Sequence, residues 1–189
     1  MEASAEDLKS FQGVQLLSSS EDDYAEAVSS LLPSYRRLRL SASGATTVVH
    51  SRALYLVLPD LIPPIDRQYT VRFFSQPPDR WRDCKGKFRP AMLPSGFDAQ
   101  FRLFQSTCIK VKHLADRVDR ALLEKERREH GVTPSKAIAN AIANYVRIVS
   151  GLASRRSNRR VDEATIESKH QSPSAAGDQA DTRLLHSSR

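Results

Sequence analysis

The loop between residues 77 and 94 places two aromatic side chains among cations. Trp81 and Phe88 lie there beside five basic residues: Arg80, Arg82, Lys85, Lys87 and Arg89. Aromatic rings in such a setting can stack nucleic-acid bases while the cations hold the backbone, which contributes about 1 to 3 kcal/mol per stacked base. The alternative is structural, because the same two rings could fasten the loop to the hydrophobic core. The loop is therefore a candidate nucleic-acid-binding element or a packed surface loop.

Positive charge is concentrated in two stretches of the chain, one of which contains this loop, rather than spread evenly along the 189 residues. The chain carries a net charge of +7, yet its first 33 residues hold one lysine against seven acids. Residues 34–52 contain four arginines, Arg52 among them, and no acid; residues 67–93 contain seven bases, Arg67 among them, and two acids. If these stretches meet in the fold, they form a basic face that suits phosphates or an acidic partner. The alternative is that the arginines are simply solvated.

Asp66 ends the short segment between these two basic stretches. Residues 45–58 predict a buried helix that Pro59 stops, and the next prolines predict an extended turn before Asp66, which is placed to cap a helix through residue 74. A capping carboxylate accepts backbone amide hydrogen bonds at the positive end of the helix dipole and stabilises it by about 0.5 to 2 kcal/mol. Capping is a complete structural reason for this aspartate.

The other residues that carry chemistry do not form a site in the sequence. His50 and Ser51 are adjacent on one predicted helix and point in different directions, so they are not a catalytic pair. Cys84 and Cys108 lie 24 residues apart without a CxxC motif or paired histidines, a pattern that excludes a structural zinc site and a disulfide scaffold. We therefore expect no metal ion, no cofactor and a reducing compartment, the cytoplasm.

No membrane partner is expected. No stretch reaches the roughly 18 consecutive apolar residues of a membrane-spanning helix. The acidic first seven residues lack the basic and apolar regions of a secretory signal.

Residues 41–74 resemble the helix-hairpin-helix DNA glycosylase superfamily. In that family a glycine-containing hairpin, roughly PGVGxKTA, leads into a helix, a proline turn and an aspartate in the motif PVD. The resemblance implies that the backbone of Gly44, Ala45 and Thr46 holds a DNA phosphate. It also implies that Asp66 is the catalytic residue that assists loss of the base.

The likeness covers 34 of 189 residues and departs from the glycosylase pattern at two positions. Thr46 replaces the second hairpin glycine, and Val48 replaces the lysine of the bifunctional members, so no covalent lyase chemistry is expected. The stretch more closely resembles the segment SKxLHxLxPxLxPxxD of uncharacterised bacterial helical proteins, which it matches at Ser51, Leu54, Leu58, Pro59, Leu61, Pro64 and Asp66. That resemblance implies a helical fold and assigns no activity.

Hydrophobic spacing predicts one long helix over residues 97–130. Apolar residues recur at intervals of four and three, at Phe97, Phe101, Phe104, Cys108, Val111, Ala115, Val118 and Leu122. This spacing forms one continuous seam. Gly131 suits the left-handed end of the helix, and the charged last turns, residues 123–130, are expected in solvent. We expect the seam to pack against its own domain, with a dimeric coiled coil as the alternative.

Start and stop signals mark further helices. Thr133 and Pro134 open a helix that Gly151 can end, and its expected apolar face comprises Ile138, Ala141, Ile142, Tyr145, Ile148 and Val149. Upstream, Ser20 caps a helix that Pro33 interrupts. Because no alternating strand pattern of useful length is present, the predicted class is all-α, a compact helical domain with a long C-terminal helical hairpin.

The composition divides the chain into three parts. Residues 1–19 are expected to be a flexible acidic N-terminus, residues 20–151 an all-α domain, and residues 152–189 a disordered tail that lacks hydrophobic periodicity. The favoured function is a non-enzymatic binding module that holds DNA or RNA on a basic face. The alternatives are a glycosylase-like enzyme that uses Asp66 and a purely structural or partner-binding protein. The oligomeric state stays open.

Overall fold

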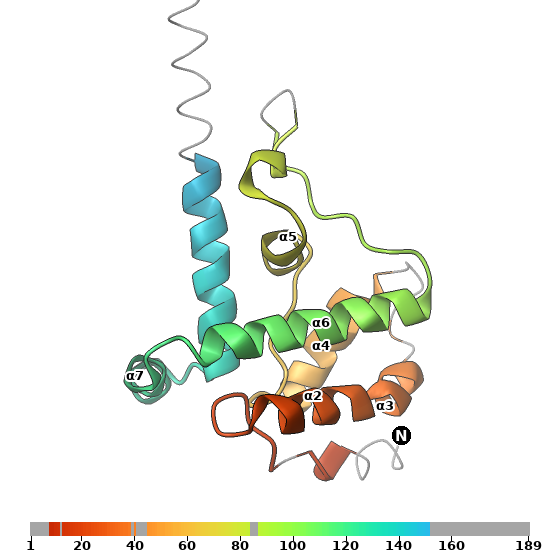
Figure 1. Ribbon diagram of the computed structural model, residues 1–189, viewed down its shortest axis with the longest axis vertical. Coiled ribbons are helices and arrows are strands. Elements are labelled where there is room, and N and C mark those ends of the chain that lie inside the picture. Colours follow the sequence, from red (N-terminus) through yellow and green to blue (C-terminus); the bar gives the residue numbers. More distant parts are fainter. Residues whose placement is uncertain (1–7, 12, 39, 41–44, 84–86, 152–189) are drawn as a thin grey trace, which may run out of the picture. The chain divides into compact units, whose positions relative to one another are not determined.

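The computed structural model describes residues 8–11, 13–38, 40, 45–83 and 87–151, and it confirms the all-α class (Figure 1). Within these residues no strand forms, and Arg82 and Phe88 make an isolated antiparallel bridge. None of the described helices combines the length and the apolar character that a bilayer crossing needs. The predicted tail at 152–189 lies outside the described residues. The helices are α2 (Glu21–Ser30), α3 (Leu32–Arg37), α4 (Thr46–Val57), α5 (Thr70–Ser75), the 3₁₀ helix η1 (Pro78–Arg80), α6 (Phe97–Ala115), α7 (Arg120–His130) and a helix at residues 134–151.

Helix α6 lies at the centre of the core, where it packs against α2, α4 and α5. The predicted seam is confirmed between residues 101 and 115, since its members there are at most 4% exposed: Phe101, Phe104, Cys108, Val111 and Ala115. Tyr35 of α3 faces this seam, with its ring centroid 5.0 Å from that of Phe101 and 5.2 Å from that of Phe104. Each large apolar side chain buried in this way stabilises the fold by about 1.5 to 3 kcal/mol.

The single long helix predicted over residues 97–130 is wrong, because a turn at residues 116–119 divides it into α6 and α7. The Asp119 carboxylate accepts the Ala121 amide at 2.9 Å and thereby caps the start of α7. The turn also changes which leucine faces the core. Leu123, expected in solvent, is 4% exposed, whereas Leu122, the last member of the predicted seam, is 53% exposed.

Local start and stop signals are confirmed elsewhere. The Ser20 hydroxyl oxygen accepts the Asp23 amide at 3.1 Å and caps α2. Pro33 lies in the first turn of α3, where it separates that helix from α2. Gly131 ends α7 with a φ of 62°, the left-handed conformation that glycine adopts without steric cost.

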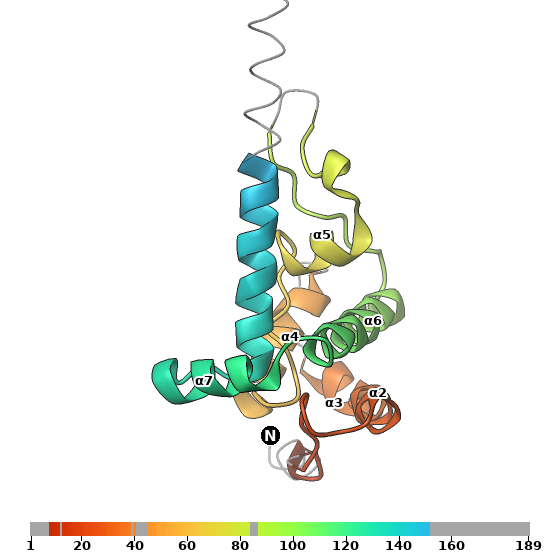
Figure 2. The ribbon, with the colours of Figure 1, turned by 60° about the vertical axis from the view of Figure 1, so that its left-hand side comes forward.

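The helix at residues 134–151 begins directly after Thr133, as predicted, and leaves α7 at a steep angle (Figure 2). Its buried stripe is narrower than the expected apolar face. Ile142 is 3% exposed, whereas Tyr145 and Ile148 are 48% and 62% exposed. Neighbouring elements therefore cover only part of this helix and leave Tyr145 and Ile148 exposed.

Candidate functional site

Asp66 is held in place by the proline-rich segment that follows α4. The Ser51 side-chain oxygen on α4 accepts the amide of the fully buried Ile65 at 3.3 Å. The Ser135 hydroxyl donates to the Pro59 carbonyl at 2.6 Å, which ties the same segment to the first turn of the helix at 134–151. Asp66 therefore follows a stretch that is anchored to both of these helices.

The carboxylate of Asp66 accepts two hydrogen bonds from the residues that lead into α5. Its Oδ1 accepts the Tyr69 amide at 2.6 Å, and its Oδ2 accepts the Thr70 hydroxyl at 3.1 Å. One backbone amide bond of the predicted kind is therefore present, but Asp66 is not the N-cap of α5, because that position is Tyr69, which makes no side-chain capping bond. The helix begins later than expected, at Thr70, because residues 67–69 first form a turn.

Asp66 borders a groove of about 570 Å³ in which every other charged residue is basic. We call it the basic groove. Helix α4 contributes Arg52, the turn after Asp66 contributes Arg67, and the helix at 134–151 contributes Lys136 and Arg147. Cations from three separate segments therefore converge on one concave surface.

The four cations of the basic groove differ in how firmly they are held. Arg67 Nε donates to the Ala91 carbonyl at 2.5 Å, and Arg147 Nε donates to the Tyr69 hydroxyl at 3.3 Å. The Arg52 and Lys136 side chains are exposed and make no hydrogen bond or ion pair with the part of the chain that the structure describes. Arg67 and Arg147 are thus held in a fixed orientation, while Arg52 and Lys136 are free to move. This combination suits the binding of phosphate or carboxylate groups through charge-assisted hydrogen bonds.

Sequence reasoning named only half of these cations. Arg52 and Arg67 were candidates, and the structure places both beside Asp66. Lys136 and Arg147 were missed. A signal for them exists, because the groove-lining residues of this helix include Lys136, Asn140, Ala143 and Arg147. Their spacing of four, three and four puts them on one helix face.

Of the predicted phosphate loop, Ala45 and Thr46 lie at the start of α4, where the Gln100 side chain of α6 accepts hydrogen bonds. The Thr47 amide donates to Gln100 Oε1 at 3.1 Å, and the Thr46 hydroxyl donates to the same oxygen at 2.9 Å. Ala45 precedes the helix, and Gly44 lies outside the described residues. The first turn of α4 is thus capped from within the fold.

Trp81 fastens its loop to the core. It is 1% exposed, and its Nε1 donates to the Gln76 carbonyl at 2.9 Å. The buried Arg72 donates to the Trp81 carbonyl at 2.5 Å, and its Cζ lies 3.7 Å from the ring centroid of Phe88. Of the two alternatives for this loop, the burial of Trp81 supports the structural one, because its ring does not reach solvent and is not open to a base.

The basic residues of this loop that the structure describes do not join the basic groove. Arg82 Nε donates to the Ser150 carbonyl at 3.0 Å, and Arg89 pairs with Asp83 at 3.2 Å. Lys85 lies outside the described residues. None of the described loop cations lines the basic groove: Arg80, Arg82, Lys87 and Arg89.

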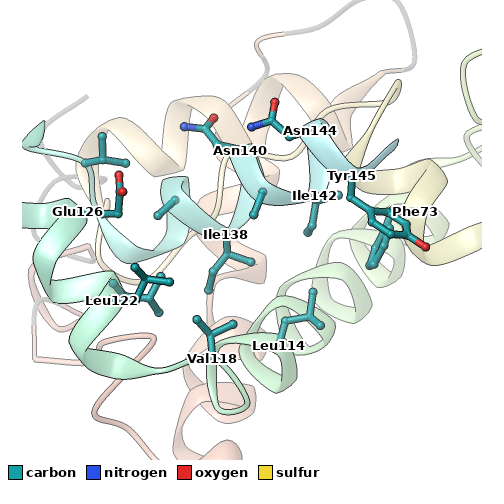
Figure 3. Close-up of a pocket in the computed structure, with 14 residues that line it drawn as sticks. Phe73, Leu114, Val118, Leu122, Glu126, Ile138, Asn140, Ile142, Asn144 and Tyr145 are labelled. Atoms are coloured by element: carbon teal, nitrogen blue, oxygen red, sulfur yellow. The ribbon is translucent and has the colours of Figure 1, made fainter. Parts of the chain in front are cut away.

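A second groove, of about 650 Å³, is mainly apolar and lies along another face of the helix at 134–151 (Figure 3). Its apolar walls come from α5, the end of α6, α7 and this helix, and include Phe73, Leu114, Leu122 and Ile142. Asn140 lines both grooves. The helix at 134–151 therefore separates a basic surface from an apolar one.

His50 and Ser51 are confirmed not to form a pair. The Ser51 oxygen bonds to Ile65, while His50 is 1% exposed and packs edge-on against Tyr35 with ring centroids 4.5 Å apart. Neither imidazole nitrogen has a hydrogen-bond partner among the described residues. Burial lowers the pKa of His50, which favours a neutral ring.

Comparisons with protein-family models, with curated proteins and with solved structures give no significant match to this chain. The residues of the basic groove are therefore the basis for assigning a function to the chain.

Proposed function

We propose that the chain is a non-enzymatic nucleic-acid-binding protein whose basic groove contacts the phosphate backbone. The observation that supports this function is the convergence of Arg52, Arg67, Lys136 and Arg147 on one concave surface. Guanidinium groups bind phosphate bidentately, and an ammonium group binds it as a point charge. The groove combines both kinds of donor.

The dimensions of the groove favour a chain of phosphates over a single small anion. Lys136 and Arg147 are eleven residues apart on one helix, and therefore about 16 Å apart along its axis. One phosphate cannot contact both ends of that line, whereas a nucleic-acid strand presents a row of them. Tyr69 also lines the groove, and an aromatic residue there suits a nucleobase better than it suits an acidic peptide.

The alternative function, base release assisted by Asp66, uses the same groove, because Asp66 lines it together with the cations. Binding alone requires nothing of Asp66 beyond its place in the turn. Both of its oxygens already accept hydrogen bonds from Tyr69 and Thr70. A binding function gives the four cations of the groove a role as phosphate contacts, and it assigns no chemistry to Asp66.

Fluorescence anisotropy with labelled DNA and RNA oligonucleotides tests the proposal. Binding at about 50 mM salt should weaken steeply as salt rises, with a log-log slope of about −0.7 per phosphate contacted on a single strand, or about −3 for four contacts. Replacing Arg52 and Lys136 together with alanine should reduce the magnitude of that slope by about 1.4.

Matched control variants are available on α7. Arg120 and Lys125 are exposed and line neither the basic nor the apolar groove, so Arg120→Ala with Lys125→Ala removes the same charge elsewhere. This pair should leave the slope unchanged. Absence of binding to every oligonucleotide at about 50 mM salt, or an equal loss in the control pair, contradicts the proposal.

A further inference from the structure

We propose that the basic groove takes a single strand in preference to a duplex and stacks one base on the paired side chains of Arg147 and Tyr69. This inference rests on the proposed nucleic-acid-binding function and adds the form of nucleic acid that the groove selects. It is carried by the geometry of that pair, by the concave shape of the groove and by the positions of the other cations.

Arg147 and Tyr69 form a layered pair at one end of the groove. The guanidinium Cζ of Arg147 lies 4.8 Å from the ring centroid of Tyr69, and its Nε donates to the Tyr69 hydroxyl at 3.3 Å. The Tyr69 ring is itself backed by Phe88, with centroids 6.2 Å apart. Because Arg147 is exposed and lines the groove, the guanidinium face turned away from Tyr69 is open to a base. Unpaired bases stack on aromatic rings and on arginine planes in this way.

The concave shape of the groove favours a strand whose bases are free. A duplex keeps its bases stacked inside, and proteins read it by inserting a protruding helix or strand pair into its major groove. The basic groove is instead a hollow of about 570 Å³, within the roughly 300 to 1,000 Å³ range of pockets that enclose small organic groups. A hollow of this size receives a nucleotide that is turned out from its neighbours.

The remaining cations are placed to hold the backbone that leads to that nucleotide. Lys136 lies about three helical turns before Arg147 on the same helix, and Arg52 reaches the groove from α4. Both side chains are exposed. Phosphates at one end of the groove and a base at the other require a strand of more than one nucleotide.

A strand without bases separates stacking from charge. We compare a short labelled single strand of mixed sequence, its duplex and an abasic strand of the same length, each as DNA, with an RNA single strand as a further arm. The wild-type protein should bind the normal single strand roughly 5- to 150-fold more tightly than the abasic strand, the range that corresponds to one stacked base. The duplex should bind more weakly than the single strand.

Two variants test the residues. Tyr69→Leu keeps the backbone amide that bonds to Asp66 and removes the ring, and Arg147→Lys keeps the charge and removes the guanidinium plane. Each should abolish most of the preference for the normal strand over the abasic one, while Arg147→Lys keeps the salt slope of the wild type. The thermal midpoint of each variant is measured, and Arg147→Lys, at an exposed position, serves if Tyr69→Leu fails to fold.

The outcomes distinguish this inference from the function on which it rests. If no oligonucleotide binds, the proposed function fails and this inference fails with it. If normal, abasic and duplex forms bind equally and only the Arg52 and Lys136 variants weaken binding, the proposed function stands and single-strand selection is overturned.

Discussion

The backbone amide of Tyr69 donates to Oδ1 of Asp66 at 2.6 Å, and this bond fixes a residue that lines the basic groove. The same carboxylate holds the Thr70 hydroxyl at the start of α5. Asp66 thereby connects the proline-rich segment to the groove surface. Its place among four cations follows from this positioning role, because the turn it closes carries both Arg67 and Tyr69.

The first prediction concerns the turn between α6 and α7. Leu123→Ala should lower the free energy of unfolding by about 2 to 5 kcal/mol, because it leaves a cavity in the core. Leu122→Ala changes a side chain that is 53% exposed and should change the stability by about 0.5 kcal/mol or less. Chemical denaturation of both variants measures the difference. A larger loss for Leu122→Ala would mean that the seam continues through residue 122 in one unbroken helix.

This turn shows which parts of the fold the sequence predicts. Caps such as Ser20 and Gly131 are local, since each depends on a few neighbouring residues, and both were predicted correctly. The break at residues 116–119 was not, because the hydrophobic spacing continues to Val118 and Leu122 while the α7 cap at Asp119 stands among other charged residues. Hydrophobic period alone does not distinguish one helix from two that share a seam.

The candidate site was predicted only in part, for a different reason. Arg52 and Arg67 lie close to Asp66 along the chain, and charge counting found them. Lys136 and Arg147 reach the groove through the tertiary placement of the helix at 134–151, to which the bond between Ser135 and the Pro59 carbonyl contributes. That contact joins residues 76 positions apart, and no local pattern encodes it. Trp81 failed as a binding residue because burial depends on such distant contacts.

The second prediction concerns the buried imidazole of His50. Burial lowers its pKa in the folded protein, so the unfolded chain takes up a proton at a higher pH than the folded one. Stability from this group is therefore fully present above the unfolded pKa of about 6.5 and is lost as the pH falls below that value. Denaturation curves between about pH 5 and 7 should show a decline in the wild type that His50→Phe reduces. His113→Gln, at a half-exposed histidine, is the control and should keep the decline due to His50; equal slopes in the wild type and His50→Phe contradict the prediction.

The last prediction separates chemistry from positioning at Asp66, because the two roles require different properties of one side chain. A catalytic carboxylate needs its charge, whereas the turn needs only a short side chain with an acceptor oxygen. Asp66→Asn should therefore stay within about 1 kcal/mol of the wild-type stability, and Asp66→Leu, which removes the acceptor, should lose about 1 to 2 kcal/mol. Because Asn also removes the one negative charge of the groove, Asp66→Asn should bind a single strand more tightly at low salt. Chemical denaturation and anisotropy measure these effects beside a base-release assay on damaged duplex DNA. Release by the wild type that Asp66→Asn abolishes, in a variant that folds normally, would make Asp66 catalytic and replace the binding function with an enzymatic one.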